Sequence, residues 1–167
     1  MELGILAGEA TSVSLWEVSL RLFIATVFGG VIGFDRERRD KPAGLRTHML
    51  ISLAAAVFTL IALELHVQLM QEHEHGNSDP IRIIEAVTSG VAFLAAGAII
   101  QGRGAVQGIT TGANMWLAGA LGVACGAGYY VLALVGAVLA LVILTFLGAV
   151  ESRIEGRSKS RAIDEGK

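Results

Sequence analysis

The sequence has almost no cysteine and little charge. Cys125 is the single cysteine among 167 residues, so no framework of disulfide bonds can form within the chain. Charged residues make up only 17% of the chain, whereas soluble domains usually carry about 25%. The formal net charge of -2 supplies no basic excess, and we expect no nucleic-acid partner.

Motifs that usually mark an enzyme are also missing. The chain contains no Gly-x-Ser-x-Gly, no phosphate-binding loop, no His-Glu-x-x-His and no Cys-x-x-Cys. No Lys or Arg precedes Arg21, whereas Glu2 and Glu9 do, so the basic region of a cleavable signal peptide is absent. We therefore expect a non-enzymatic protein that needs no cofactor and whose first residues are not a signal peptide.

Apolar residues are concentrated in blocks that approach the length of a bilayer span, which is about 20 residues. These blocks lie near residues 18–34, 47–65, 83–100, 105–125 and 129–150. They predict an all-α, polytopic membrane bundle of about five transmembrane helices within residues 1–150. Residues 151–167 form a short charged tail. A soluble helical bundle is the alternative interpretation.

The charges between the blocks alternate in a way that predicts orientation. The first connection contains a dense basic and acidic block, Asp35–His48, which we interpret as a loop on the cytoplasmic face. The second, from Gln71 to Pro80, has no Lys or Arg. The third contains Arg103, and the tail is again basic. The rule that short basic loops stay inside then places the N-terminus outside and the C-terminus inside.

Two of the predicted spans carry stripes of small and polar side chains at helical spacing. The stripe of the third span is Glu85, Thr88, Ser89, Ala92 and Ala96, with Arg82 at its margin. The stripe of the fourth is Gln107, Thr110, Thr111, Asn114, Ala118 and Cys125. We expect Asn114 to be buried, with partners on another helix. We also expect the two stripes to face each other, either as a hydrogen-bonded helix pair or as a narrow polar pathway.

Arg21 in the first span is the natural counter-charge, and we expect it to pair with Glu85 or Glu64. Glu85 could instead pair with Arg82 or reach the membrane interface.

Glycine pairs suggest close contacts between helices. Gly29 and Gly30 precede Gly33 in the first span, and Gly108/Gly112 and Gly122/Gly126 follow the Gly-x-x-x-Gly pattern. Packing inside one bundle and homodimerisation both use such faces. The glycine-rich segment 97–112 predicts a tight turn, with a broken helix as the alternative.

Two sets of neighbouring residues contain side chains of the types that bind metal ions. The first is a histidine and carboxylate cluster near the outer face: His66, Glu72, His73, Glu74, His75 and Asp79. Its spacing fits no closed site. The second is Asp35, Glu37 and Asp40, whose charges are offset by neighbouring basic residues. We predict no metal site from either group.

Three motifs, taken together, resemble the signature of the MgtC/SapB family of bacterial membrane proteins. They are Gly33–Glu37 with Lys41–His48; Asp79-Pro80-x-Arg82 with Ser89–Ile100; and Gly108–Trp116 with Ala120-x-Gly122-x-Ala124-x-Gly126. The resemblance covers roughly residues 20–130. Alanine stands at Ala92 and Ala95 where the family usually has glycine, and Gly112-Ala113 stands where it usually has Ala-Ala. Some members have a further soluble domain, whose activities the resemblance does not carry over.

The resemblance implies a bacterial inner-membrane protein linked to growth at low magnesium and, in pathogens, to virulence. The best-described member of the family restrains the F-type ATP synthase. Our leading hypothesis is a homodimeric protein that modulates ion or Mg²⁺ homeostasis by binding other membrane proteins. In this reading Arg46 either contacts a partner or clamps the first loop by bonding Asp35 or Glu37. The alternative is a small transporter or channel whose path is lined by Glu85, Thr110, Thr111 and Asn114.

Overall fold

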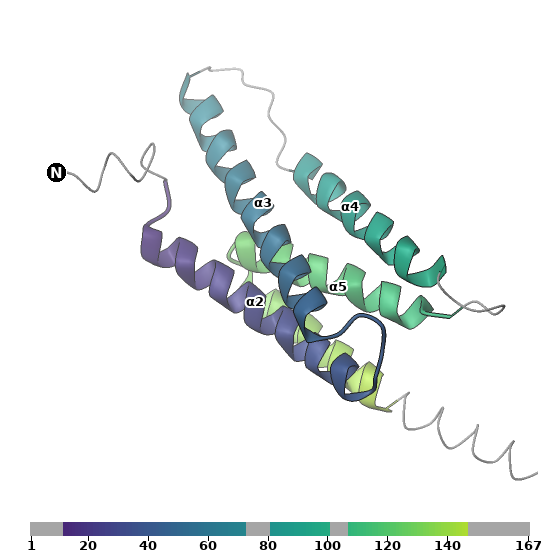
Figure 1. The fold of residues 1–167 in the computed structure, drawn as a ribbon. Helices are drawn as coiled ribbons and strands as arrows, with labels where there is room; N and C mark the ends of the chain where they lie inside the picture. The colour runs from purple at the N-terminus through teal and green to yellow at the C-terminus, as the bar shows by residue number, and fades with distance from the viewer. Residues whose placement is uncertain (1–11, 73–80, 101–106, 147–167) are drawn as a thin grey trace, which may run out of the picture.

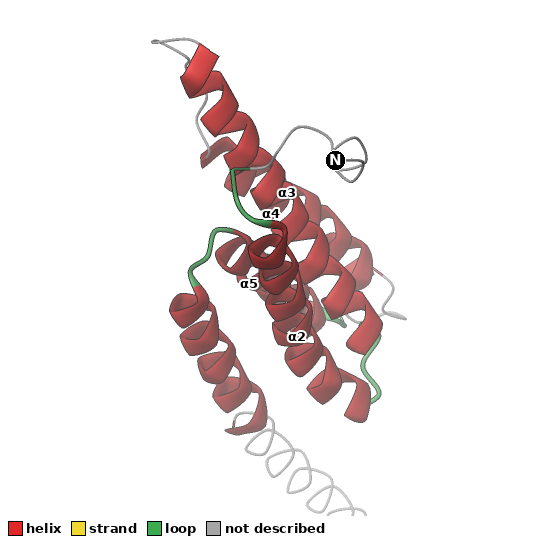
Figure 2. Cartoon of the chain, turned by 90° about the vertical axis from the view of Figure 1, so that its left-hand side faces the viewer, coloured by secondary structure: helices red, strands yellow, loops and turns green. Residues whose placement is uncertain are grey.

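The computed structural model describes residues 12–72, 81–100 and 107–146, and all regular structure within them is helical (Figure 2). The helices are α2 (Leu15–Arg38), α3 (Leu45–Glu72), α4 (Ile81–Ile100) and α5 (Ile109–Gly126). A further helix, Tyr130–Phe146, follows α5. Each predicted apolar block contributes one helix, so the predicted all-α class is confirmed.

Length and surface composition identify the molecule as a membrane helix bundle. The segments Leu15–Arg38, Leu45–Met70 and Ile81–Ile99 are long and apolar enough to cross a bilayer. Large apolar side chains also cover the outside: Phe23 is 67% exposed and Phe93 is 80% exposed. Such a surface suits lipid rather than water. The predicted orientation across the membrane stays a prediction.

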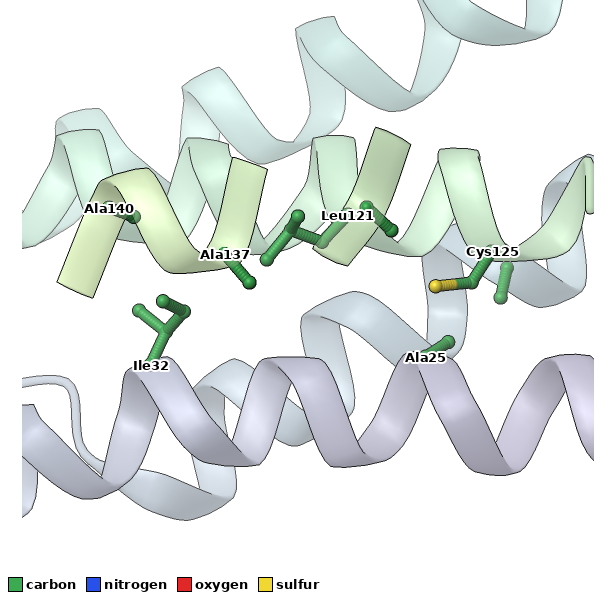
Figure 3. Packing of buried hydrophobic residues seen from close by; sticks show 8 residues of the cluster. Ala25, Ile32, Leu121, Cys125, Ala137 and Ala140 are labelled. Carbon is green, nitrogen blue, oxygen red and sulfur yellow. The ribbon is translucent and has the colours of Figure 1, made fainter. Parts of the chain in front are cut away.

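The core is built from small side chains, which lets the helices approach closely. Ala25 and Ile32 of α2 pack against Cys125 of α5 and against Ala137 and Ala140 of the Tyr130–Phe146 helix (Figure 3). A second cluster joins α3, α4 and α5; it includes Ile51, Ala55, Val87, Val91, Met115 and Ala118. The helix Tyr130–Phe146 thus covers α2, while α4 covers α5.

Glycines mark the tightest crossings. A methyl group on Gly29 would lie 2.5 Å from the carbonyl oxygen of His48 in α3, and one on Gly126 would lie 2.7 Å from that of Ala56. Gly122 likewise contacts the backbone of Ser52. The glycine pairs of α2 and α5 therefore serve packing inside the bundle, as one of the two readings of the sequence predicted.

Helix α4 lies at the edge of the bundle, beside α5 (Figure 1). Among the described helices it contacts α5 and α3 but not α2. Its buried residues form one line, Val87, Val91 and Ala95, and Val91 packs against Gly119 of α5. Most of the circumference of α4 is therefore exposed.

The dense charged block is mostly helical, which corrects the prediction that Asp35–His48 is a loop. Helix α2 continues to Arg38 and α3 begins at Leu45, so the connection comprises only residues 39–44. Helix α2 continues because Ala25, Gly29, Ile32 and Arg36 recur on its buried face. Asp40 ends the turn with a φ of 51°, a left-handed conformation that aspartate tolerates better than most residues.

Candidate functional site

The short connection between α2 and α3 is closed by Glu37. Its carboxylate accepts a hydrogen bond of 2.9 Å from the backbone N–H of Leu45, in the first turn of α3. Asp35 is engaged by Arg39, whose Nε lies 3.1 Å from the carboxylate. Arg46 is exposed and forms no ion pair with any described residue. The predicted clamp by Arg46 is therefore wrong, and Glu37 closes the loop by capping α3.

A buried arginine joins the end of α2 to the start of α5. Arg36 is only 4% exposed, and its Nη2 donates a hydrogen bond of 3.0 Å to Oγ1 of Thr111. Asn114, one turn further along α5, is 6% exposed. The burial of Asn114 was predicted from the sequence, whereas the buried position of Arg36 was not.

His48 of α3 completes this group from a third helix. Its side chain is fully buried and lies near Gly33, where an added methyl group would be 3.0 Å from His48 Cβ. The Nδ1 atom lies 2.8 Å from the carbonyl oxygen of Gly44. Because a carbonyl only accepts, Nδ1 carries the proton in this contact. We call Arg36, His48, Thr111 and Asn114 the Arg36 cluster.

Several polar atoms of the Arg36 cluster have no partner among the described residues. They are Nε of Arg36, Nε2 of His48 and Nδ2 of Asn114. The ion pairs within the described ranges join Arg21 to Glu17 and Arg39 to Asp35, so no carboxylate there forms an ion pair with Arg36. A buried polar atom without a partner usually costs about 1–3 kcal/mol, and more for a charged group. This concentration of unmet hydrogen bonds distinguishes the cluster from ordinary packing.

Arg21 has a structural role that differs from the predicted one. Its Nη2 pairs with Glu17 one turn earlier in α2, and its Nη1 donates a hydrogen bond of 2.8 Å to the carbonyl oxygen of Gly126. Glu64 instead accepts hydrogen bonds from Ser12, at 2.8 Å from the backbone nitrogen. The predicted pairing of Arg21 with Glu85 or Glu64 is therefore wrong.

The two polar stripes do not face each other, which corrects another prediction. On α4, Glu85 and Ser89 are exposed, and α5 is contacted by the opposite, apolar side. On α5, Thr111 is buried against Arg36 of α2 and Asn114 is buried as well, whereas Thr110 is exposed. Arg82 is exposed at the margin of the α4 stripe, as predicted. Within the described residues the stripes form neither a hydrogen-bonded helix pair nor a shared pathway.

Other candidate residues lie outside the described ranges. Asp79 and its neighbours in residues 73–80 belong to this group, and so do Arg103 and the tail 151–167. The described ranges contain no cluster of three or more His, Cys, Asp or Glu side chains suited to a metal ion. The histidine and carboxylate cluster falls mostly outside those ranges.

One signal in the sequence could have identified Arg36. It follows Gly29 and Ile32 at the spacing of a helix face, so extending the periodicity by one turn places it inside the bundle. The prediction that Arg36 belongs to a basic loop is therefore wrong, because Arg36 lies on the buried face of α2. His48 belongs to one of the three motifs, but the local sequence pattern gives no signal that this polar side chain is buried.

Comparison with known proteins supports the resemblance of the motifs. The MgtC family matches residues 22–153. YhiD of Escherichia coli K12 is 34% identical over 142 residues, which cover 85% of this chain and 66% of YhiD. SapB of Bacillus subtilis is 34% identical over 83% of this chain and 60% of its own length. MgtC of Brucella abortus is 34% identical over 82% of this chain and 54% of its own length.

The chain thus spans at most about two thirds of the length of these relatives. No solved structure matches it. The family match contains all three motifs and the whole Arg36 cluster. By the extent of this match and by its relatives, the chain belongs to the MgtC family.

Proposed function

We propose that the protein is a non-enzymatic, multi-pass protein of the bacterial inner membrane that modulates ion or Mg²⁺ homeostasis by binding other membrane proteins. Membership of the MgtC family supports a role related to magnesium. The name of the Escherichia coli relative proposes magnesium transport. The partner is a second copy of the chain, another membrane protein such as the F-type ATP synthase, or both.

The exposed side of α4 is the observation that carries this proposal. We call Glu85, Ser89, Gly90, Ala92, Ala96 and Gly97 the α4 outer face; all are exposed. A methyl group added to Gly90 or Gly97 would have no neighbour within 4 Å. A carboxylate that faces lipid costs several kcal/mol unless it is paired or hydrated. A partner helix that covers this face would remove that cost, and the small residues would let it approach closely.

Transport is the alternative function. A path within one chain would need the polar sides of α4 and α5 to line it together, but these helices meet through Val87, Val91 and Ala95. A transport path would therefore have to run along the α4 outer face between two copies. Only that function requires Glu85 to bind an ion or change its protonation state during each cycle.

Complementation at low Mg²⁺ tests the proposal. A strain that lacks the protein would receive the wild type, Ser89→Leu or Ala54→Leu, and growth would be followed at low and high Mg²⁺. Ala54→Leu is the matched control because Ala54 is also a small exposed residue, but on α3. We expect Ser89→Leu to lose complementation while remaining folded in the membrane, and Ala54→Leu to complement.

A flux measurement separates the two functions. The purified protein would be reconstituted in liposomes and tested for H⁺, Na⁺, K⁺ and Mg²⁺ flux, with Glu85→Gln as the comparison. Our proposal predicts no saturable flux from folded protein. Saturable flux that Glu85→Gln abolishes would replace the proposal with transport. Full complementation by Ser89→Leu would remove the α4 outer face from the function.

A further inference from the structure

The first turn of α5 has backbone donors that the helix itself does not satisfy. Its N-cap is Gly108, which has a φ of 87° and no side chain to accept the hydrogen bonds of the turn. The first backbone bond of the helix runs from the N–H of Gly112 to the carbonyl oxygen of Gly108. The N–H groups of the three preceding residues therefore have no partner within the helix. Together with the helix dipole, such groups favour a negative charge at this end.

Arg36 supplies an independent indication of a ligand at the same place. Arg36 is only 4% exposed, and its guanidinium reaches the first turn of α5 through Thr111. Within the part of the chain that the structure describes, its Nε has no hydrogen-bond partner, and neither has Nδ2 of Asn114 on the next turn. Both of these N–H groups are donors, so their missing partner is an acceptor, whereas Nε2 of His48 is the unmet acceptor of the Arg36 cluster. A neutral water could accept a hydrogen bond, but it would add no negative charge beside Arg36, whose acidic neighbour Asp35 is already paired with Arg39.

We propose that the junction of α2 and α5 binds an oxyanion of the phosphate class, held by Arg36, Thr111, Asn114 and the open N-terminus of α5. Planar guanidinium and backbone N–H groups are suited to phosphate oxygens. The Thr111 hydroxyl accepts from Arg36 and is free to donate its own hydrogen to the anion. Ile109 and Thr110 are exposed beside this turn, which leaves a route of entry. This binding does not depend on the proposed function.

The phosphate comes either from solution or from the headgroup of an anionic lipid, because both present the same oxygens. The experiment therefore has two arms on the full-length protein, purified in neutral detergent and stripped of lipid. In the first arm, the unfolding temperature is measured against sodium phosphate, with sodium chloride at equal ionic strength as the reference. In the second, native mass spectrometry compares retention of phosphatidylglycerol with that of phosphatidylcholine.

Variants tie the response to the site. Arg36→Gln removes the buried charge, and Arg36→Lys keeps the charge but not the planar donors. Arg38→Gln is the matched control, because Arg38 is an exposed arginine on the same helix that stacks on Phe34, with its Cζ 5.7 Å from the ring centroid. We expect wild type and Arg38→Gln to respond alike, Arg36→Lys to respond more weakly, and Arg36→Gln not to respond.

Each outcome decides the proposal. Saturable stabilisation by phosphate that exceeds the chloride reference identifies a soluble anion, and selective retention of phosphatidylglycerol identifies a lipid. Either result supports the site if Arg36→Gln abolishes it. A wild-type protein that responds in neither arm overturns the proposal, and this test needs no variant to fold. A response that Arg36→Gln leaves unchanged overturns it too, because the anion would then bind elsewhere.

Discussion

The carboxylate of Glu37, in the last turn of α2, accepts a hydrogen bond of 2.9 Å from the backbone N–H of Leu45, the first residue of α3. One side chain thus ends one helix and begins the next, and it fixes the hairpin that the two helices form. The carboxylate also packs against Gly44, where no larger side chain would fit without displacing it.

Replacing Glu37 by alanine should destabilise the protein by about 1 kcal/mol, the usual cost of losing a helix cap. The loss is measurable by unfolding in mixed detergent and denaturant micelles. Asp40→Asn is a suitable control, because it removes one negative charge from the same connection, where Asp40 is exposed. Equal losses from the two variants would show that charge, rather than the hydrogen bond to Leu45, is responsible.

Gly126→Ala should be destabilising by about 1–3 kcal/mol, as expected for overpacking of a close helix contact. The added methyl group would lie 2.7 Å from the carbonyl oxygen of Ala56. Gly97→Ala is the matched control, because the same change there meets nothing within 4 Å and should leave stability unchanged or slightly improved. Unfolding curves of the two variants compare them directly, and a harmless Gly126→Ala would contradict the packing described for α3 and α5.

A double-mutant cycle should detect coupling between Arg21 and Glu17 but none between Arg21 and Glu85. Arg21 forms its ion pair with Glu17, whereas Glu85 is exposed on a helix that does not contact α2. We expect a coupling free energy of at least about 0.5 kcal/mol for Arg21→Met with Glu17→Gln. The cycle with Glu85→Gln should be additive; measurable coupling there would restore the pairing predicted from the sequence.

Cys125 should resist alkylation in the folded protein. Its side chain is fully buried in the cluster that includes Ala25 and Ala133. Labelling with a maleimide should be slow in mild detergent and complete after denaturation in SDS. Asp40→Cys in a Cys125→Ala background provides an exposed reference thiol that should react at once. Rapid labelling of Cys125 without denaturant would show that α5 and the Tyr130–Phe146 helix separate readily.

The sequence was sufficient to predict the helices because each coincides with an apolar block, three of them of spanning length. It was also sufficient to predict that Asn114 is buried, since an amide on a small-residue stripe needs a helix partner. The direction that a stripe faces was not predictable in the same way. Helix α4 carries both an apolar line through Val91 and a polar line through Glu85, and in a membrane either side can face a neighbour or lipid.

The site was less predictable because its members depend on contacts between distant segments. Arg36 and Thr111 are 75 positions apart in the chain, and local periodicity carries no information on their pairing. The opposite holds for Arg21. It pairs with Glu17, only four residues away, and not with the more distant Glu64 or Glu85 that the charge pattern predicts.

The edge position of α4 has a consequence for the order of assembly. The helix with which α4 mainly packs, α5, follows it in the chain. During synthesis α4 therefore enters the bilayer before the surface that receives Val87 and Val91 exists. Until α5 emerges, α3 is the described helix on which α4 can pack, and the unmet face of α4 is open to insertion factors or to neighbouring chains.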